Sequence, residues 1–438
     1  MEKFLAKFKG INYRLLFALI VMGLCPTIYT TLRVFWLGNL PNEYAFSIAG
    51  QLGWINLIYE ILNEAIILPL FYFLGENLEN KKEFSNKLKT GLLVSGLSYL
   101  LLSIIIMSLT EPLLNLMATD PAIIKESATY IRIESTANIF GILSQFVYVA
   151  LVTIGKDKSV YVLTFVKLLL FVILDVFLLS SFKVSANLGV NGIGYSNIIV
   201  NFLMFVITTI ILAKYGYNIF NLTKLDFKWM LKFVKIGGLS GLESLVRNLF
   251  YMLMICRMVN VVNEQGTYWV ANNFIWNWLL LPILQLGELI KQEVALDKQH
   301  IKNNLWGYIF ITSGFCLLWF ILIPAYKPFM KHVMNFDDVD KLFNLVMVLI
   351  GFYVMFAIQN IFDSIFYGCG KTNYMLSESI ITNVIYYGIC FILYLNNVFV
   401  PTLTGIALMF GIGVAFDSIV SYIAFIIFMK KNKRKLGY

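Results

Sequence analysis

The chain has 438 residues, of which 59% are hydrophobic and only 13% are charged, and its mean hydropathy is +0.77. A soluble domain carries about 25% charged residues because its surface must face water, so this composition excludes a water-soluble protein. The formal net charge of +9 is not a nucleic-acid signal, because the basic residues are distributed in step with the apolar segments.

Apolar runs of roughly 20 residues recur along the whole chain, which is the length that a helix needs to cross ~30 Å of hydrocarbon. Barrel strands would instead alternate polar and apolar residues. We therefore predict an all-α integral membrane protein with about twelve transmembrane helices in two pseudo-symmetric bundles of six. In chain order, the predicted spans are residues 15–39, 45–74, 90–109, 128–154, 159–181, 189–213, 233–261, 268–294, 305–325, 342–367, 374–395 and 405–429.

Lysine and arginine are concentrated in every second connection, as in the polar stretch 75–89, the linker 214–230 and the tail 430–435. Cytoplasmic loops carry such an excess, so we expect a multi-pass protein of the plasma or inner membrane with both termini in the cytoplasm. The stretch 75–89 is expected to be a loop. We expect no cleavable signal peptide, since the first apolar run is too long and leads into a second span.

The residues that enzyme or metal chemistry requires are scattered. The two histidines, His300 and His332, lie alone in predicted loops, and the five cysteines form no CxxC pair. Neither a metal cluster nor a nucleophile with a histidine base is indicated, and the chain has no GxxxxGK[ST] phosphate loop. We therefore expect no enzyme activity, no metal and no cofactor, and any pumping would draw on an ion gradient or a partner.

Two short phrases, Gly155-Lys156 and Gly370-Lys371, follow the fourth predicted span of each half and open the next pair of spans. Halves that repeat their hydropathy plan, breaks included, indicate a duplication, and such repeats are typical of transporters with a substrate site between the halves. The predicted divisions are an N-terminal bundle at 1–213, a cytoplasmic linker at 214–230 and a C-terminal bundle with a basic tail at 231–438.

Charged residues repeat inside the first two predicted spans of each half. Arg33 and Glu64 occupy the first pair, and Arg257 and Glu288 occupy the second pair at the same interval. A parallel repeat would place such groups at equivalent depths on facing bundles.

At the two Gly-Lys phrases the sequence resembles the multidrug and toxic compound extrusion (MATE) family. Members end the fourth span of each half in a turn of the form L-R-G-x-G-[KD]-[TR]-x-x-P, and residues 151–157 and 367–372 are similar to it. Residues 188–197 look like the family's G-V-x-G-A-A-x-A-T stretch, and residues 34–40 are similar to its T-x-x-V-G-x-L-G. The resemblance covers essentially the whole chain. It implies a V-shaped pair of six-helix bundles that exports organic solutes in exchange for Na⁺ or H⁺.

Three positions depart from the pattern of that family. Arg33 stands where many relatives have an aspartate, Arg247 is nearest to the glutamate of span seven, and Phe356 aligns with the acid of span ten. Of the acids that relatives use for coupling, the one in span five is present: Leu174-Asp175-Val176 resembles the family's L-D-P.

A charged side chain near the bilayer centre costs at least ~2.5–3.5 kcal/mol, so such residues face a partner or a wet cavity. Arginines lining a cavity could grip a carboxylate or phosphate. Alternatively, they pair internally: Glu243 and Arg247 lie four residues apart on one helix, and Arg33 could neutralise an acid of the neighbouring span. The residues predicted to line a substrate cavity are Arg33, Glu64, Arg247, Arg257, Glu288, Gln359, Asn360 and Asp363.

Asp175, inside an apolar run, is the predicted coupling residue. A buried carboxylate could bind and release a proton, or ligate Na⁺ together with the side-chain oxygens of Thr164 and Asn197. Lys167, two turns away on the same helix, could instead neutralise Asp175 as a structural pair.

We therefore predict a secondary active exporter that moves organic solutes or drugs by alternating access, driven by H⁺ or Na⁺, with anionic or zwitterionic substrates favoured by the arginines. A flippase for a lipid-linked molecule and a membrane-embedded transferase are the alternatives. The expected partners are the lipid bilayer, a small organic substrate and the coupling cation, with no nucleic acid, and the chain is expected to act as a monomer.

Overall fold

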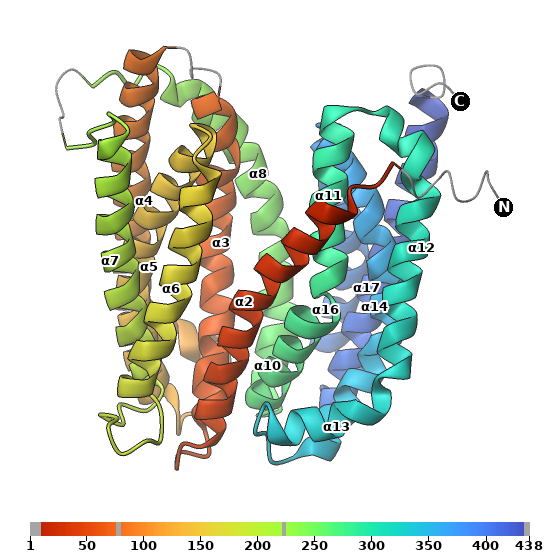
Figure 1. Ribbon diagram of the computed structural model, residues 1–438. Helices are drawn as coiled ribbons and strands as arrows, with labels where there is room; N and C mark the ends of the chain where they lie inside the picture. The colour runs from red at the N-terminus through yellow and green to blue at the C-terminus, as the bar shows by residue number, and fades with distance from the viewer. Residues whose placement is uncertain (1–9, 76–79, 221–224, 433–438) are drawn as a thin grey trace. The chain divides into compact units, whose positions relative to one another are not determined.

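The computed structural model describes residues 10–75, 80–220 and 225–432 (Figure 1). Within those ranges all regular secondary structure is helical, and helices occupy each of the predicted span positions. The helices of the first half are α2 (Tyr13–Gly38), α3 (Ala45–Gly75), α4 (Lys81–Leu116), α5 (Ile124–Thr153), α6 (Asp157–Leu178) and α7 (Asn191–Lys214).

Three spans of the second half contain a π-helical turn, labelled η. In chain order, the spans of the second half are α8 (Met230–Tyr251) with η1 (Met252–Cys256) and α9 (Arg257–Val261); α10 (Gln265–Phe274) with η2 (Ile275–Leu279) and α11 (Leu281–Leu296); α12 (Gln299–Ile321); α14 (Val339–Gly368); α15 (Thr372–Ile381) with η3 (Thr382–Tyr387) and α16 (Gly388–Leu395); and α17 (Leu403–Asn432). A short helix, α13 (Ile323–His332), was not predicted.

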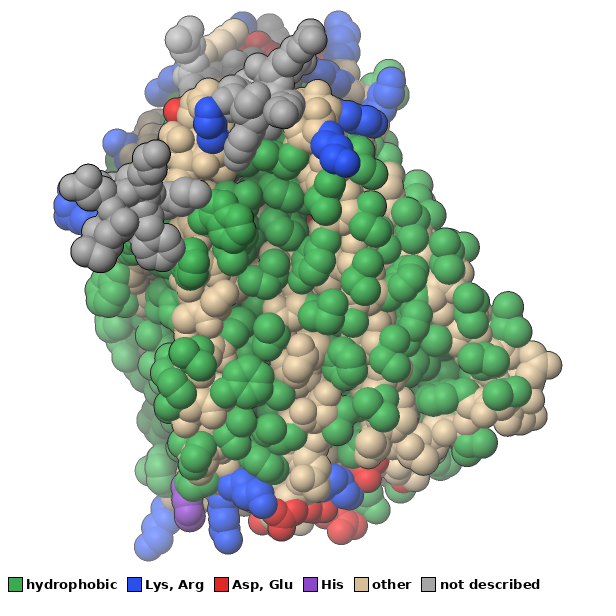
Figure 2. Space-filling model, turned by 90° about the vertical axis from the view of Figure 1, so that its right-hand side faces the viewer, with side chains coloured by type: hydrophobic (Ala, Val, Ile, Leu, Met, Phe, Trp, Pro, Cys, Tyr) green, Lys and Arg blue, Asp and Glu red, His purple; other side chains and the backbone are tan. Residues whose placement is uncertain are grey.

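The surface of the helices confirms a membrane protein. Ten helices of the described residues are long and apolar enough to cross a bilayer. Large apolar side chains point outward along them, such as Leu317 and Ile321 on α12 and Ile419 and Ile423 on α17. Figure 2 shows one face on which hydrophobic side chains cover the middle, while Lys and Arg lie toward its upper and lower ends. Apolar contact with lipid and charged ends in water are what a spanning helix requires.

The chain divides into two compact units. One, here the N-half unit, is residues 36–266 and holds α3 to α9; the other, the C-half unit, is residues 1–35 with 267–438 and holds α2 and α10 to α17. The first span of each sequence half therefore belongs to the compact unit of the other half. The predicted linker, 214–230, matches the connection between α7 and α8. The predicted division of the sequence at that linker stays a prediction.

The predicted loop at 75–89 is wrong in its second part. Residues 76–79 lie outside the described residues, but α4 already begins at Lys81, and the side chain of Asn80 accepts a hydrogen bond from a backbone N–H of the first turn. This turn presents Phe84 to the interior, fully buried. Lysine and glutamate are good helix formers, so a polar, charged stretch with a good cap extends the helix beyond the membrane.

Both Gly-Lys phrases form the same helix end. Gly155 follows α5 with φ = +71°, and Gly370 follows α14 with φ = +65°. In each case the next lysine donates its N–H to a carbonyl five residues earlier, that of Leu151 at 3.0 Å and that of Phe366 at 2.8 Å. This is the Schellman end of a helix, which favours glycine because other residues are strained at positive φ. The repeated phrases are therefore explained by a backbone requirement.

We predict that Gly155→Ala and Gly370→Ala each lower the free energy of unfolding by about 1 kcal/mol, because an L side chain is strained in the left-handed region. Nothing lies within 4 Å of a Cβ at either position, so sterics play no part. Gly314→Ala, in the middle of α12 with equally open space, is the matched control. Thermal unfolding in detergent measures the effect, and equal melting temperatures for all three variants would contradict it.

Candidate functional site

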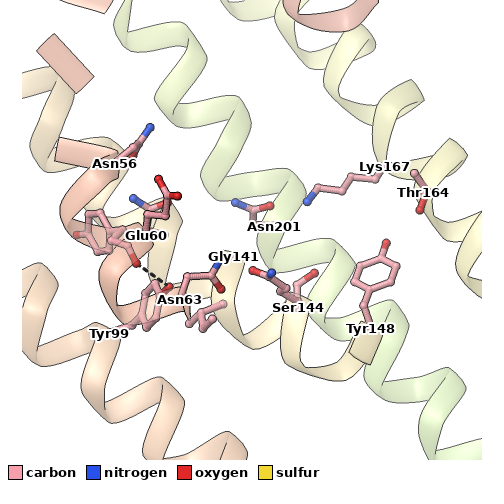
Figure 3. A pocket seen from close by; sticks show the side chains of 14 residues that line it. Asn56, Glu60, Asn63, Tyr99, Gly141, Ser144, Tyr148, Thr164, Lys167 and Asn201 are labelled. Atoms are coloured by element: carbon pink, nitrogen blue, oxygen red, sulfur yellow. Dashed lines mark hydrogen bonds between the residues drawn. The ribbon is translucent and has the colours of Figure 1, made fainter. Parts of the chain in front are cut away.

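A cavity of about 520 Å³ lies inside the N-half unit, and its wall is built from α3, α4, α5, α6 and α7 (Figure 3). On α3 the wall residues Asn56, Glu60 and Asn63 recur every three or four positions, so they share one face of the helix. The packing of α5 against α3, α4 and α7 holds this polar face inside the unit.

The α5 side of the cavity repeats the same pattern. Asn138, Gln145 and Tyr148 lie on one face of α5. Asn201 on α7 also faces the cavity. The sequence analysis missed these amides and hydroxyls, although their helical spacing inside apolar runs was a signal that could have found them.

Four polar atoms in this wall are buried and have no hydrogen-bond partner: Asn63 Oδ1, Asn138 Nδ2, Ser144 Oγ and Tyr148 OH. An unpaired buried polar atom costs about 1–3 kcal/mol, and native proteins rarely tolerate it. Several such atoms around one cavity indicate a space that polar matter enters, either water or a polar ligand.

The cavity carries one acidic and one basic side chain. Figure 3 shows Lys167 reaching from α6 toward Asn201, with Glu60 on the α3 side of the cavity. A single carboxylate and a single ammonium group within an amide-rich wall can orient a polar solute that bears both signs of charge.

Arg247 on α8 is surrounded by three carboxylates of its own unit. Its Nη2 donates to Glu64 Oε1 at 2.7 Å and to Glu60 Oε1 at 3.4 Å, and its Nη1 donates to Glu243 Oε1 at 3.1 Å. The expected internal pair of Glu243 and Arg247 is therefore present. Because three acids surround one guanidinium, this group is occupied and the cluster has a negative excess charge.

Comparison with known proteins identifies the fold. Residues 72–177 match the MatE family model, and no curated protein sequence matches the chain. Solved structures match over nearly the full length. A mutant of the Vibrio cholerae MATE transporter VcmN has 15% identity, covers 98% of this chain and 99% of that chain, and has a TM-score of 0.71. An inward-facing multidrug resistance MATE family transporter has 15% identity, 93% and 95% coverage and a TM-score of 0.76.

The chain has the fold of the MATE transporters. A transporter of the MOP superfamily from Pyrococcus furiosus, described as having a binding pocket of reverse polarity, also matches, with 14% identity, 98% coverage of both chains and a TM-score of 0.72. The expected all-α architecture is thereby confirmed, and the family that these comparisons name is one of transporters, not enzymes.

The other predicted cavity residues of the MATE-like chain make local contacts. The Arg33 guanidinium lies 4.4 Å from the ring centroid of Tyr29. Arg257 donates its Nε–H to the carbonyl of Leu116 at 3.0 Å. Glu288 accepts from Lys291 Nζ at 2.6 Å, and both side chains are exposed or partly so. Of the predicted charged residues, Glu64 and Arg247 contact each other directly.

The predicted coupling residues lie on α6 and α7. Asp175 is fully buried, and Thr164 lines the cavity while its hydroxyl donates to the carbonyl of Val160 at 2.9 Å. Asn197 Nδ2 donates hydrogen bonds to both carboxylate oxygens of Glu134, at 2.7 and 3.0 Å. Glu134, only 4% exposed, is a buried acid of α5 that the sequence analysis missed.

The predicted cavity residues of span ten, on α14, contact two neighbouring helices, α17 and α11. Gln359 Nε2 donates to Asp417 Oδ2 at 2.7 Å, and Asp363 Oδ1 accepts from Ser421 Oγ at 2.8 Å, so both face α17. Asn360 Nδ2 donates to the carbonyl of Ile283 on α11 at 3.1 Å. The polar face of α14 is thus a connection to α17 and α11 within the C-half unit.

We predict that Arg247→Gln lowers the free energy of unfolding by about 2 kcal/mol, because three carboxylates lose their shared counter-charge in a partly buried site. Adding Glu64→Gln should restore part of this loss. Arg132→Gln is the matched control, since Arg132 pairs with a single exposed acid, Glu111, at 3.1 Å, and an exposed pair contributes about 0.2–1 kcal/mol.

Melting temperature in detergent and the folded yield measure the effect of these substitutions. An Arg247→Gln protein of wild-type stability whose transport changes its preference between anionic and cationic substrates would contradict the structural role and favour anion binding.

Proposed function

We propose that the chain is a secondary active exporter that moves a small polar organic solute out of the cell in exchange for H⁺ or Na⁺. The observation that carries this proposal is the cavity of about 520 Å³ with its unpartnered polar atoms, Asn63 Oδ1, Asn138 Nδ2, Ser144 Oγ and Tyr148 OH, inside a protein with the MATE fold. Ligand pockets for small molecules typically have volumes of about 300–1,000 Å³, so the cavity is of a suitable size.

The chemistry of the cavity favours a zwitterionic substrate. Glu60 can attract an ammonium group and Lys167 a carboxylate, while the amides of Asn138, Gln145 and Asn201 offer donors and acceptors. Arg247 is a weaker candidate for an anion, because three acids already bind its guanidinium. A drug-like or metabolic amino acid derivative has this combination of groups.

Alternating access is the transport mechanism in this proposal, and the gradient of the driving ion sets its direction. Solved MATE structures of the same fold exist in an inward-facing and in an outward-facing conformation, the latter at 14% identity, 98% coverage of both chains and a TM-score of 0.70. The basic connections and tail support the proposal that both termini lie in the cytoplasm and that the membrane is a plasma or inner membrane. We further propose that the chain acts as a monomer.

Asn138→Leu is expected to reduce solute uptake into inverted membrane vesicles about tenfold, since the loss of a hydrogen-bonding group to a polar ligand costs about 1.4 kcal/mol or more. Asn396→Leu, at an exposed helix end of the C-half unit, is the control. Imposed Na⁺ and pH gradients drive the assay. Equal uptake by both variants and the wild type would show that the cavity is not the binding site.

Lys167→Met is expected to change the preference among substrates, because it leaves Glu60 as the cavity's own charge. Uptake of a zwitterionic probe should fall, while uptake of its cationic ester should be retained or rise. Lys183→Met, an exposed lysine outside α6, is the control. If both probes lose uptake equally in Lys167→Met while folded yield is unchanged, the assignment of Lys167 to substrate charge is wrong.

A further inference from the structure

Three carboxylic acids from three helices gather inside the C-half unit: Asp363 on α14, Glu378 on α15 and Asp417 on α17. These helices pack against one another. Glu378 is only 4% exposed, and its carboxyl group lies close enough to both aspartates to interact with them electrostatically. The sequence analysis did not single out Glu378.

Two of the three carboxyl groups are held by hydrogen-bond donors. Asp417 accepts at Oδ2 from Gln359 Nε2 and at Oδ1 from Thr382 Oγ1, both at 2.7 Å, and Asp363 accepts at Oδ1 from Ser421 Oγ at 2.8 Å. Glu378 differs at one oxygen: its group interacts with Asp363 and Ser421, but its Oε1 is buried and has no hydrogen-bond partner. An acceptor without a donor at such a site is completed if the group itself carries a proton or binds a cation.

No basic side chain of the described residues forms an ion pair with any of these three acids. The other titratable groups that face the cluster are Tyr387 of η3, beside Asp417, and Tyr422 of α17, beside Asp363. A neutral phenol cannot balance a carboxylate. Three negative charges side by side inside a bilayer are strongly unfavourable, so binding a proton or another cation stabilises the cluster.

We propose that Glu378 and Asp363 form a proton-binding site, in which one proton bound to Glu378 is shared with the carboxylate of Asp363 and Asp417 remains a hydrogen-bonded acceptor. Adjacent carboxyl groups commonly hold a single proton between them, because two like charges in contact are unfavourable. Among the residues that the structure describes, no group of acids, histidines or cysteines is arranged to hold a metal ion.

The position of the cluster along its helices suits a proton that enters from one side of the membrane. Measured along the helix axis, Glu378 lies about 9 Å from the first residue of α15, Thr372, and Asp417 lies about 22 Å from the last residue of α17, Asn432. Both helix ends are on the predicted cytoplasmic side. Because the three carboxyl groups interact with one another, they share one depth, near the start of α15, and α17 continues further beyond them. This inference rests on the proposed function, because it takes the bound proton to be the ion that drives the exporter.

The test begins with the purified full-length protein, without substrate. Infrared difference spectra across a pH titration report protonated buried carboxyl groups by their carbonyl stretch. We expect a buried carboxyl band in the wild type that Glu378→Gln abolishes and Asp363→Asn abolishes or shifts. Asp340→Asn is the control on α14, because Asp340 is 80% exposed and should leave the band unchanged. Size-exclusion chromatography verifies that each variant is folded.

The same variants are then reconstituted in liposomes. Glu378→Gln should lose all stimulation of uptake by a pH gradient while keeping solute exchange without a gradient. A band that persists in both Glu378→Gln and Asp363→Asn overturns the proposal, as does a pH-gradient response that survives in Glu378→Gln. A band that Na⁺ removes at constant pH also overturns it, in favour of a sodium site. If the wild type transports no probe but shows the carboxyl band, the proposed function fails while the proton site stands.

Discussion

A charged group inside a bilayer must be neutralised by its own surroundings, and this constraint explains the polar interior of both compact units. In the N-half unit, Arg247 is held by Glu60, Glu64 and Glu243, so one guanidinium joins α3 to α8. The contact of Arg247 with Glu64, at 2.7 Å, is charge-assisted and short, so it stabilises the packing of α3 against α8. The position of these helices therefore depends on this cluster as well as on apolar packing.

The same constraint leads to a different arrangement in the C-half unit. Its acids, Asp363, Glu378 and Asp417, have serine, threonine and glutamine donors around them and no basic partner among the described residues. Arginine does not release its proton at physiological pH, so the positive charge of Arg247 is permanent. Acids that are balanced by a proton can change their charge. In the proposed mechanism, one compact unit therefore binds the solute and the other responds to the proton.

The positions at which the chain departs from the MATE sequence pattern are informative in this light. Arg247 lies nearest to the glutamate that cation-coupled relatives carry in span seven, and the structure supplies three acids around it from α3 and α8. Phe356 aligns with the acid of span ten, whereas Asp363, about two turns further along α14, joins the cluster with α15 and α17. The charges are thus placed differently on a shared fold, and this is the reason to expect a substrate and a coupling route of the chain's own.

The sequence by itself determined the membrane class, the positions of the helical spans and the repeated helix ends, but not that α4 begins at Lys81. Long apolar runs have one solution in lipid, and a glycine at positive φ is a local requirement of the backbone. The cavity, by contrast, was decided by tertiary structure. Asn63 and Asn138 lie on different helices, and only the packing of α3 against α5 shows that both face one space.

The ionic partners were likewise decided in three dimensions. Spacing along one helix predicted the pair of Glu243 and Arg247, because neighbours four residues apart lie on the same face. It could not predict that Glu64 would be the nearest acid to Arg247, nor that Glu378 would meet Asp363, since these residues are brought together by contacts between helices. Periodicity determines which face of a helix is polar, whereas only packing determines what that face meets.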